Sequence, residues 1–376
     1  MVEAMLLELT QRKVELAGQT IETIYFGGGT PSMLSERDLG RIFETVYKLY
    51  TVAPNPEITL EANPDDLTPT YLDTLRQTPV NRLSIGIQSF RDEDLKYMNR
   101  AHNAQEASTC VQLAQDKGFE ALSIDLIYGM PTGTDKDWEQ NLKTALLLRP
   151  QHLSAYCLTV EPGTALSHMV KKGTAPAVDD DAASRQFMLL TEMSQAVGYE
   201  HYEISNLARN EHYARHNSNY WKGKPYLGVG PAAHSYDGQH RRWNVANNAK
   251  YIKAINAGAV YSETETLTRN DQYNEFLMTR LRTAALPCVR EVRGRGLLVG
   301  VALDPALADA ADIAERLLAR GIATRDTNGN VIRLAPPLVI DEATLDEAAS
   351  RIIDTLRNHL ATRVATDPRA RVAHMQ

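Results

Sequence analysis

A run of glycines gives the first sign of a ligand site. Gly27, Gly28 and Gly29 precede Thr30 and directly follow the apolar segment TIYF. Glycines at such a point let backbone N–H groups approach a carboxylate or another anion closely. The triplet matches neither a GxGxxG nor a P-loop pattern, so a tight structural turn explains it equally well.

Polar side chains recur where the following apolar segments end. They are Glu61 and Asn63, then Gln88, then Asp125 and Tyr128, then Thr159 and Glu161. In βα barrels, functional groups gather where strands end and loops begin. We therefore predict a binding site at this edge of a sheet.

A second candidate site is the aromatic and polar loop expected over residues 215–236. It contains the run His216-Asn217-Ser218-Asn219-Tyr220-Trp221. A neutral imidazole can ligate iron, and Tyr and Trp supply flat apolar area for a planar ligand. A packed surface loop is the alternative interpretation, and His234 is a secondary candidate ligand.

Alternating strands and helices must position these residues. The predicted strands are Thr23–Gly29, Glu57–Pro64, Arg82–Ser89, Ala121–Pro131 and His152–Pro162. The predicted helices between them are Glu36–Leu49, Pro69–Gln77, Ala104–Lys117 and Trp138–Leu148, with Ser35 as an N-cap. Regular βα alternation predicts a parallel sheet. Near-continuous apolar strands predict an α/β partial barrel with both strand faces covered.

Composition bounds the function. The 376 residues carry a net charge of −7 with 43% hydrophobic residues, which indicates a globular protein without a nucleic-acid partner. The N-terminal segment is acidic and predicts an amphipathic helix rather than a signal peptide. No apolar run approaches the roughly 18 residues that a transmembrane helix needs, so a cytoplasmic location is expected.

The composition changes near Thr283. Every aromatic residue lies at or before Phe276 and every lysine at or before Lys253. Two joined sources, or a natural linker before an Ala-rich domain, would explain the change. A loose segment near Ala284–Cys288 is expected to link the two parts, and the tail's apolar residues could pack on one another: Leu297, Val299, Val301, Leu334, Leu338 and Val339. The tail predicts a small α+β unit: a strand pair in EVRGRGLLVGVALD, a helix over Pro305–Arg320, an extended VIRLAPPLVI and a last helix over Glu342–Ala361.

The motifs together resemble one family. TIYFGGGTPS, ITLEANPDD, RLSIGIQSF, LKYMNRAH, SIDLIYGMP and LSAYCLTVEPGT occur in the order and spacing of the HemW heme chaperones. These are similar to oxygen-independent coproporphyrinogen III oxidases of the radical S-adenosylmethionine superfamily. The resemblance covers the chain to about Arg282 and implies a partial radical S-adenosylmethionine barrel.

The resemblance assigns roles to the candidate residues. Gly28, Gly29 and Thr30 would contact the amino and carboxylate end of S-adenosylmethionine, and Glu61 would accept hydrogen bonds from it. Gln88, Arg100 and Asp125 would line the same mouth or a second ligand position, and Thr159 would lie near the adenosine. Loop caps or surface ion pairs are the alternatives. His216, Asn217, Tyr220 and Trp221 match the HNxxYW motif linked to heme binding.

The sequence departs from that family at the cofactor. The family begins with a strand and a CxxxCxxC loop that holds a [4Fe–4S] cluster, and this sequence begins after that loop, so the barrel is expected to lack its first strand. Cys110, Cys157 and Cys288 are scattered, and an iron–sulfur cluster needs converging thiolates. We therefore predict no metal ligands and no catalytic residues.

The tail is similar to the C-terminal small domain of ornithine and acetylornithine aminotransferases. There, Arg333 would hold a substrate carboxylate with its forked donors, and a surface arginine is the alternative. The pyridoxal-phosphate lysine has no counterpart, because no Lys follows Lys253.

The expected organisation is therefore a partial barrel over 1–175, a heme-binding region over 176–283 and an aminotransferase-like unit over 284–376. The expected function is heme binding and delivery to an acceptor protein, defective where it depends on the cluster. A coproporphyrinogen-oxidising enzyme and an aminotransferase fragment are the alternatives.

Overall fold

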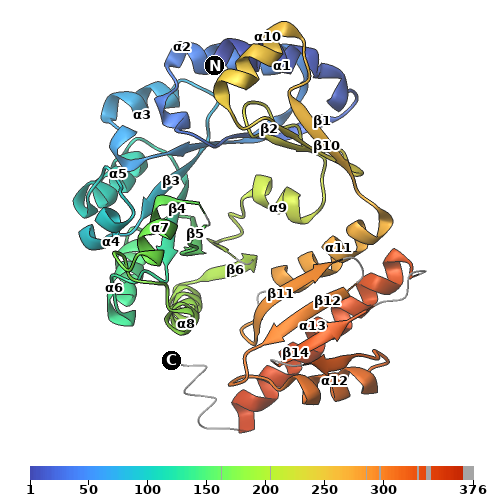
Figure 1. Cartoon of the computed structure of the whole chain (residues 1–376). Helices are drawn as coiled ribbons and strands as arrows, with labels where there is room; N and C mark the ends of the chain where they lie inside the picture. Colours follow the sequence, from blue (N-terminus) through green and yellow to red (C-terminus); the bar gives the residue numbers. More distant parts are fainter. Residues whose placement is uncertain are drawn as a thin grey trace. The chain divides into compact units, whose positions relative to one another are not determined.

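The computed structural model describes residues 1–376 except 162, 204, 285, 296–297, 328–329, 336–339 and 367–376. The chain divides into two compact units. The first comprises residues 1–200 and 205–265, and the second comprises 201–204 and 266–376. Each unit is described by itself (Figure 1).

A curved seven-stranded sheet forms the frame of the first unit, with strand order β1-β2-β3-β4-β5-β7-β6. The strands are β1 (Thr20–Phe26), β2 (Thr51–Ala62), β3 (Arg82–Gln88), β4 (Ala121–Tyr128), β5 (His152–Cys157), β6 (Tyr199–Glu203) and β7 (Asn206–Arg209). β1 to β5 are parallel neighbours, and β7 pairs antiparallel with β5. The predicted α/β partial barrel is confirmed.

Helices cover the outer face of this sheet (Figure 1). They are α2 (Glu36–Leu49), α3 (Pro69–Arg76), α4 (Asp92–Tyr97), α5 (Ala104–Asp116), α6 (Asp135–Leu147) and α8 (Asp180–Ala196). α2 has the predicted bounds, and the Ser35 side chain accepts a hydrogen bond from the Asp38 N–H at 3.1 Å, as its N-cap role requires. α4 was not predicted.

The main hydrophobic core lies between this sheet and these helices. Leu60, Leu83, Ile85 and Leu122 of the strands are fully buried there, together with Leu39 of α2. Burying such side chains is worth about 1.5–3 kcal/mol each, which fixes the sheet and therefore the inner face that carries the site.

The remaining elements of the first unit include the helices α1 (Val2–Gln11), α7 (Ala165–Lys171), α9 (Arg215–Trp221) and α10 (Asn248–Ala257). The strands β8 (His234–Tyr236), β9 (His240–Asn244) and β10 (Ser262–Thr266) form a small sheet in the order β10-β9-β8. Residues 215–221 were expected to form a loop. They form α9, which packs against β1.

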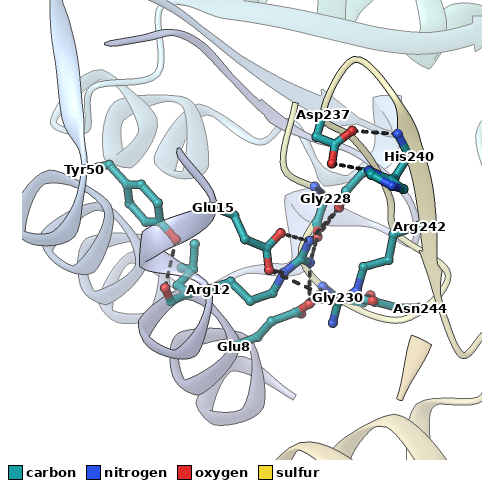
Figure 2. A network of polar contacts seen from close by, with 12 residues as sticks. Glu8, Arg12, Glu15, Tyr50, Gly228, Gly230, Asp237, His240, Arg242 and Asn244 are labelled. Carbon is teal, nitrogen blue, oxygen red and sulfur yellow. Dashed lines mark hydrogen bonds and ion pairs between the residues drawn. The ribbon is translucent and has the colours of Figure 1, made fainter. Parts of the chain in front are cut away.

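A buried polar network fastens α1 to the segment around β8 and α10 (Figure 2). The Glu8 carboxylate accepts hydrogen bonds from Arg12 at 2.9 Å, from the Gly230 N–H at 2.9 Å and from Asn244 at 2.8 Å. The Tyr251 hydroxyl also donates to it. Glu8 is 0% exposed and Arg12 3%. A charged pair can be buried in this way only because its remaining donors and acceptors are satisfied.

The second unit holds the antiparallel sheet β11-β12-β14-β13. Its elements are β11 (Val289–Arg295), β12 (Leu298–Leu303), β13 (Arg325–Thr327), β14 (Val331–Leu334), α11 (Arg269–Thr283), α12 (Ala310–Ala319) and α13 (Glu342–Thr366). The predicted small α+β unit is confirmed. The helix expected over Pro305–Arg320 begins only at Ala310, because Asp309 caps it.

The compositional change near Thr283 does not mark a loose junction. α11, which precedes it, contributes Leu277 and Leu281 to the same core as Leu286 and Cys288. An ion pair of 2.9 Å joins Arg280 of α11 to Asp346 of α13. The expectation of a loose segment over Ala284–Cys288 was therefore wrong.

Apolar residues of the tail pack into the hydrophobic core of the second unit. Val299, Val301 and Leu334 are buried together. Leu297, Leu338 and Val339, expected to join them, lie outside the described residues.

Candidate functional site

The concave face of the large sheet encloses a cavity of about 300 Å³. Of the predicted site residues, it brings together Gly29, Thr30, Glu61, Asn63, Gln88, Arg100, Asp125, His216 and Asn217. Residues at the ends of β1, β2 and β3, together with Asp125 within β4, thus meet residues of α9, some 90 positions or more further along the chain.

Sequence reasoning missed the rest of the cavity wall. It includes inward-facing polar residues along the strands: Glu57 and Thr59 of β2, Arg82 and Ser84 of β3, Ser123 of β4, and His152 and Ser154 of β5. Successive strand residues point to opposite faces, so these positions alternate with the apolar core positions. The expectation of two apolar faces was therefore wrong. The signal was present in RLSIGIQ and HLSAYC, where polar and apolar residues alternate.

Glu61 is fixed at the end of β2 that meets the glycine loop. Its carboxylate accepts hydrogen bonds from the Tyr25 hydroxyl at 2.8 Å and from the Gly28 N–H at 3.2 Å. Gly28 and Gly29 have φ values of 72° and 76°, a region that favours glycine. The Gly28 N–H already donates to Glu61, but with no Cβ to shield it the backbone N–H of Gly29 can be approached closely, which suits the carboxylate of an amino-acid ligand.

Arg100 reaches the same edge from the segment after α4. Its guanidinium donates to the Asn63 side chain at 2.7 Å and to the Gly86 carbonyl at 3.2 Å. Gln88 has φ of 65°, which is uncommon for a residue with a side chain and marks a constrained backbone at the end of β3.

Asp125 is one of three acidic residues that line the cavity, with Glu57 and Glu61. The Ser84 hydroxyl donates to its carboxylate at 3.2 Å. Burial raises the pKa of Asp125 to about 6, and the nearby Glu61 carboxylate also raises it, although hydrogen bonds from Ser154 and Ser84 oppose the shift. Asp125 can therefore exchange a proton near neutral pH.

His152 lies deeper in the wall. Its Nδ1 atom is 2.7 Å from the Ser123 hydroxyl. Burial, with the nearby Arg82 guanidinium, holds the pKa of His152 well below its usual value. This imidazole is neutral at physiological pH.

Three side chains contact the His216 ring at the edge of the cavity. Its ring stacks on the Tyr25 ring with centroids 4.7 Å apart. Its Nδ1 atom is 2.9 Å from the Thr23 hydroxyl, and its Nε2 atom is 3.0 Å from the Tyr220 hydroxyl. Burial lowers the pKa of His216, so the imidazole is in the neutral form that binds metals.

The remaining predicted residues lie outside the cavity lining. The Gly28 N–H donates a hydrogen bond to Glu61, which does line the cavity. The Tyr220 hydroxyl is within hydrogen-bonding distance of His216, another lining residue, and Trp221 is half-buried on α9. Thr159 is exposed, with its hydroxyl 3.4 Å from the Cys157 carbonyl. His234 is exposed on β8, and Arg333 is exposed on β14 of the other unit, opposite Arg325 in the strand register.

The three cysteines do not fit a [4Fe–4S] cluster. Cys110 is buried in α5, Cys157 is exposed on β5, and Cys288 is buried in the core of the second unit. Within the described ranges, no group of three or more Cys, His, Asp or Glu side chains could hold a metal ion.

Comparison with known proteins identifies the relatives. The sequence profile of the Radical SAM superfamily matches residues 2–145. The heme chaperone HemW of Bacillus subtilis is 34% identical over 290 residues, which is 76% of this chain and 76% of the relative. HemW of Mycobacterium tuberculosis is 36% identical over 76% of this chain and 74% of the relative.

The chain belongs to the HemW family. The fold agrees: coproporphyrinogen III oxidase (HemN) from Escherichia coli, a Radical SAM enzyme, superposes with a TM-score of 0.67 and 20% identity, covering 94% of this chain and 82% of that one. This confirms the predicted family and fold class.

A second profile, Aminotransferase class-III, matches residues 245–356. It overlaps the part aligned to HemW and includes α11, which packs into the second unit. No helix in the described parts of the chain combines the length and the apolar composition needed to cross a bilayer.

Proposed function

We propose that this chain binds heme at α9 and delivers it to an acceptor protein, as the name of the HemW chaperones describes. The observation that carries the proposal is the setting of His216, a neutral imidazole stacked on Tyr25 at the edge of the cavity. A neutral imidazole nitrogen is a common axial ligand of heme iron. Aromatic side chains around it supply flat apolar area for the macrocycle.

Iron binding requires one rearrangement. Both ring nitrogens of His216 already have a hydroxyl within hydrogen-bonding distance. Thr23 lies on β1, whereas Tyr220 is 48% exposed on a short helix. We expect Tyr220 to move away so that Nε2 can bind iron, while Thr23 keeps the ring oriented through Nδ1. Such a partner on the second nitrogen is typical of metal-binding histidines.

S-adenosylmethionine binding at the strand ends is part of the same proposal. Gly28, Gly29, Thr30 and Glu61 would hold its amino-acid end, and Gln88, Arg100 and Asp125 would line the same mouth. All of these residues except Gly28 line one cavity, which supports this assignment. Thr159, which is exposed, has less support.

The proposal also assigns a role to each region of the chain. Residues 1–175 would bind S-adenosylmethionine and residues 176–283 would bind heme. Residues 284–376 would form an aminotransferase-like unit, in which Arg333 has no assigned ligand. A cytoplasmic location completes it.

Hemin titration tests the central step. We expect His216→Ala to weaken hemin binding at least tenfold, about 1.4 kcal/mol, and to change the Soret band. His234→Ala is the matched control, because His234 is an exposed histidine of the same unit. An unchanged titration for His216→Ala, with a loss for His234→Ala, would move the iron ligand to β8 and contradict the proposal.

A further inference from the structure

The end of the cavity where β3 begins, here called its floor, contains an arginine without a hydrogen-bond acceptor among the described residues. Arg82 opens β3, is 4% exposed and lines the cavity. Among the residues that the structure describes, its buried Nη2 atom has no hydrogen-bond partner. The same holds for the hydroxyl of Thr59, which is its register neighbour on β2. Two unsatisfied polar groups therefore lie side by side on the inner face.

The nearby acidic groups are engaged elsewhere. Glu57 accepts hydrogen bonds from the backbone of α9, and Glu61 accepts from Tyr25 and Gly28. Asp125, which feels the charge of Arg82, accepts from Ser84. The neutral His152 supplies no negative charge. A buried guanidinium without a hydrogen-bonded counter-ion is costly, and a ligand that supplies the acceptors would remove that cost.

We propose that Arg82 and Thr59 form a carboxylate-binding subsite at the floor of the cavity. The planar guanidinium presents parallel N–H donors that match the two oxygens of a carboxylate, and the Thr59 hydroxyl can donate a further hydrogen bond. The raised pKa of Asp125 lets that side chain take up a proton and so reduces repulsion when an anion enters.

This subsite lies at the opposite end of β3 from Gln88. Arg82 and Gln88 are the first and last residues of β3, so they lie roughly 20 Å apart along the strand. The glycine loop is nearer, because Phe26 before it is in register with Leu60 of β2, and Leu60 is in register with Leu83, the residue after Arg82. The subsite goes beyond the proposed function, because a small carboxylate can occupy it without heme.

Propionate is the minimal probe, and propionamide is its uncharged counterpart. We expect propionate, but not propionamide, to raise the thermal midpoint of the full chain. Arg82→Gln should weaken propionate binding at least tenfold, and Arg82→Lys, which keeps the charge, should retain part of it. Arg185→Gln is the control, since Arg185 is an arginine of the same unit that lies outside the cavity lining and pairs with Asp135 at 2.7 Å.

Stability without ligand gives a second readout. If Arg82 lacks a structural partner, Arg82→Gln should unfold at the same urea concentration as the parent chain or at a higher one. A clear loss of stability, equal propionate binding by Arg82→Gln and the parent chain, or no binding by the parent chain would each overturn the proposal.

Two sources of the carboxylate can be distinguished. If it is a porphyrin propionate, Arg82→Gln should weaken hemin binding at least tenfold while leaving the affinity for hemin dimethyl ester unchanged. If it is a separate small acid, hemin affinity should not change and propionate should still bind beside hemin. Either result supports the subsite, and neither requires His216 to be the iron ligand.

Discussion

The carboxylate of Glu57 on β2 accepts a hydrogen bond from the backbone N–H of His216 at 2.8 Å, across 159 residues of sequence. Its other oxygen accepts from the N–H of Arg215 at 2.9 Å. The residue before α9, Ala214, has no side chain that could cap the helix. Glu57 therefore does so from another strand, with its charge at the positive end of the helix.

Glu57→Ala should release the start of α9. We expect about 1–2 kcal/mol less free energy of unfolding, as for the loss of an N-cap, and faster hydrogen exchange at the amides of Arg215 and His216. Glu57→Gln keeps one acceptor and should lose less. Unchanged exchange at both amides in Glu57→Ala would show that α9 is held by other contacts.

Tyr220→Phe should preserve or strengthen hemin binding. The substitution keeps the ring but removes the hydroxyl that occupies Nε2 of His216. If the Tyr220 hydroxyl must be displaced before iron binds, removing that hydroxyl lowers the free-energy cost of hemin binding. A spectroscopic titration against the parent chain measures this, and a tenfold loss would indicate instead that the hydroxyl itself contacts the ligand.

Asp125→Asn should stabilise the fold at pH 8 and have little effect at pH 4. The pKa of Asp125 is raised to about 6 in the folded chain from its ordinary value of 3.8, so the folded state binds the proton more tightly. Ionisation therefore costs stability progressively between these values, and the full cost is present above pH 6. We expect a gain of about 2 kcal/mol at pH 8 in urea unfolding, after allowance for partial exposure. A gain of equal size at pH 4 would contradict this origin.

Glu8→Gln should strongly destabilise the first unit. Removing the carboxylate charge leaves the buried Arg12 with only the partly exposed Glu15 as an ion-pair partner, and breaking a buried pair costs about 3–5 kcal/mol. Glu3→Gln is the control on the same helix, because its ion pair with Arg41 is exposed, and it should leave stability unchanged. Chemical unfolding of both variants measures this difference. If Glu8→Gln and Glu3→Gln have the same free energy of unfolding, the network contributes little to stability.

Local signals in the sequence predicted much of the fold. α2 follows from its apolar spacing and from Ser35, and the five parallel strands follow from short apolar runs closed by Gly, Pro or Asn. The strand-end residues Glu61 and Gln88 could be found because the edge of a parallel sheet is a general place for ligands. Asp125 was also found, although it lies within β4 and not at the end of the strand where it was expected.

The missed features depend on contacts that sequence spacing does not show. α9 spans seven residues, too few for a periodic pattern, and its cap comes from Glu57 on a distant strand. Arg82 and His152 were missed because the strands were interpreted as apolar on both faces, although every second residue is polar. The place of α11 in the second unit could not be predicted because the compositional change falls after the helix, whereas the packing begins within it.

The network around Glu8 has a consequence for synthesis on the ribosome. Glu8 and Tyr251 are 243 residues apart, so α1 leaves the ribosome long before its last partner is made. At typical rates of roughly 5–20 residues per second, the delay is on the order of 10–50 seconds. During that time the Glu8 carboxylate lacks the hydrogen-bond donors that Gly230, Asn244 and Tyr251 supply, and the last of them is present only when α10 has been translated. Nascent chains stalled before residue 251 should therefore expose α1 to proteases, and chains released after it should protect it.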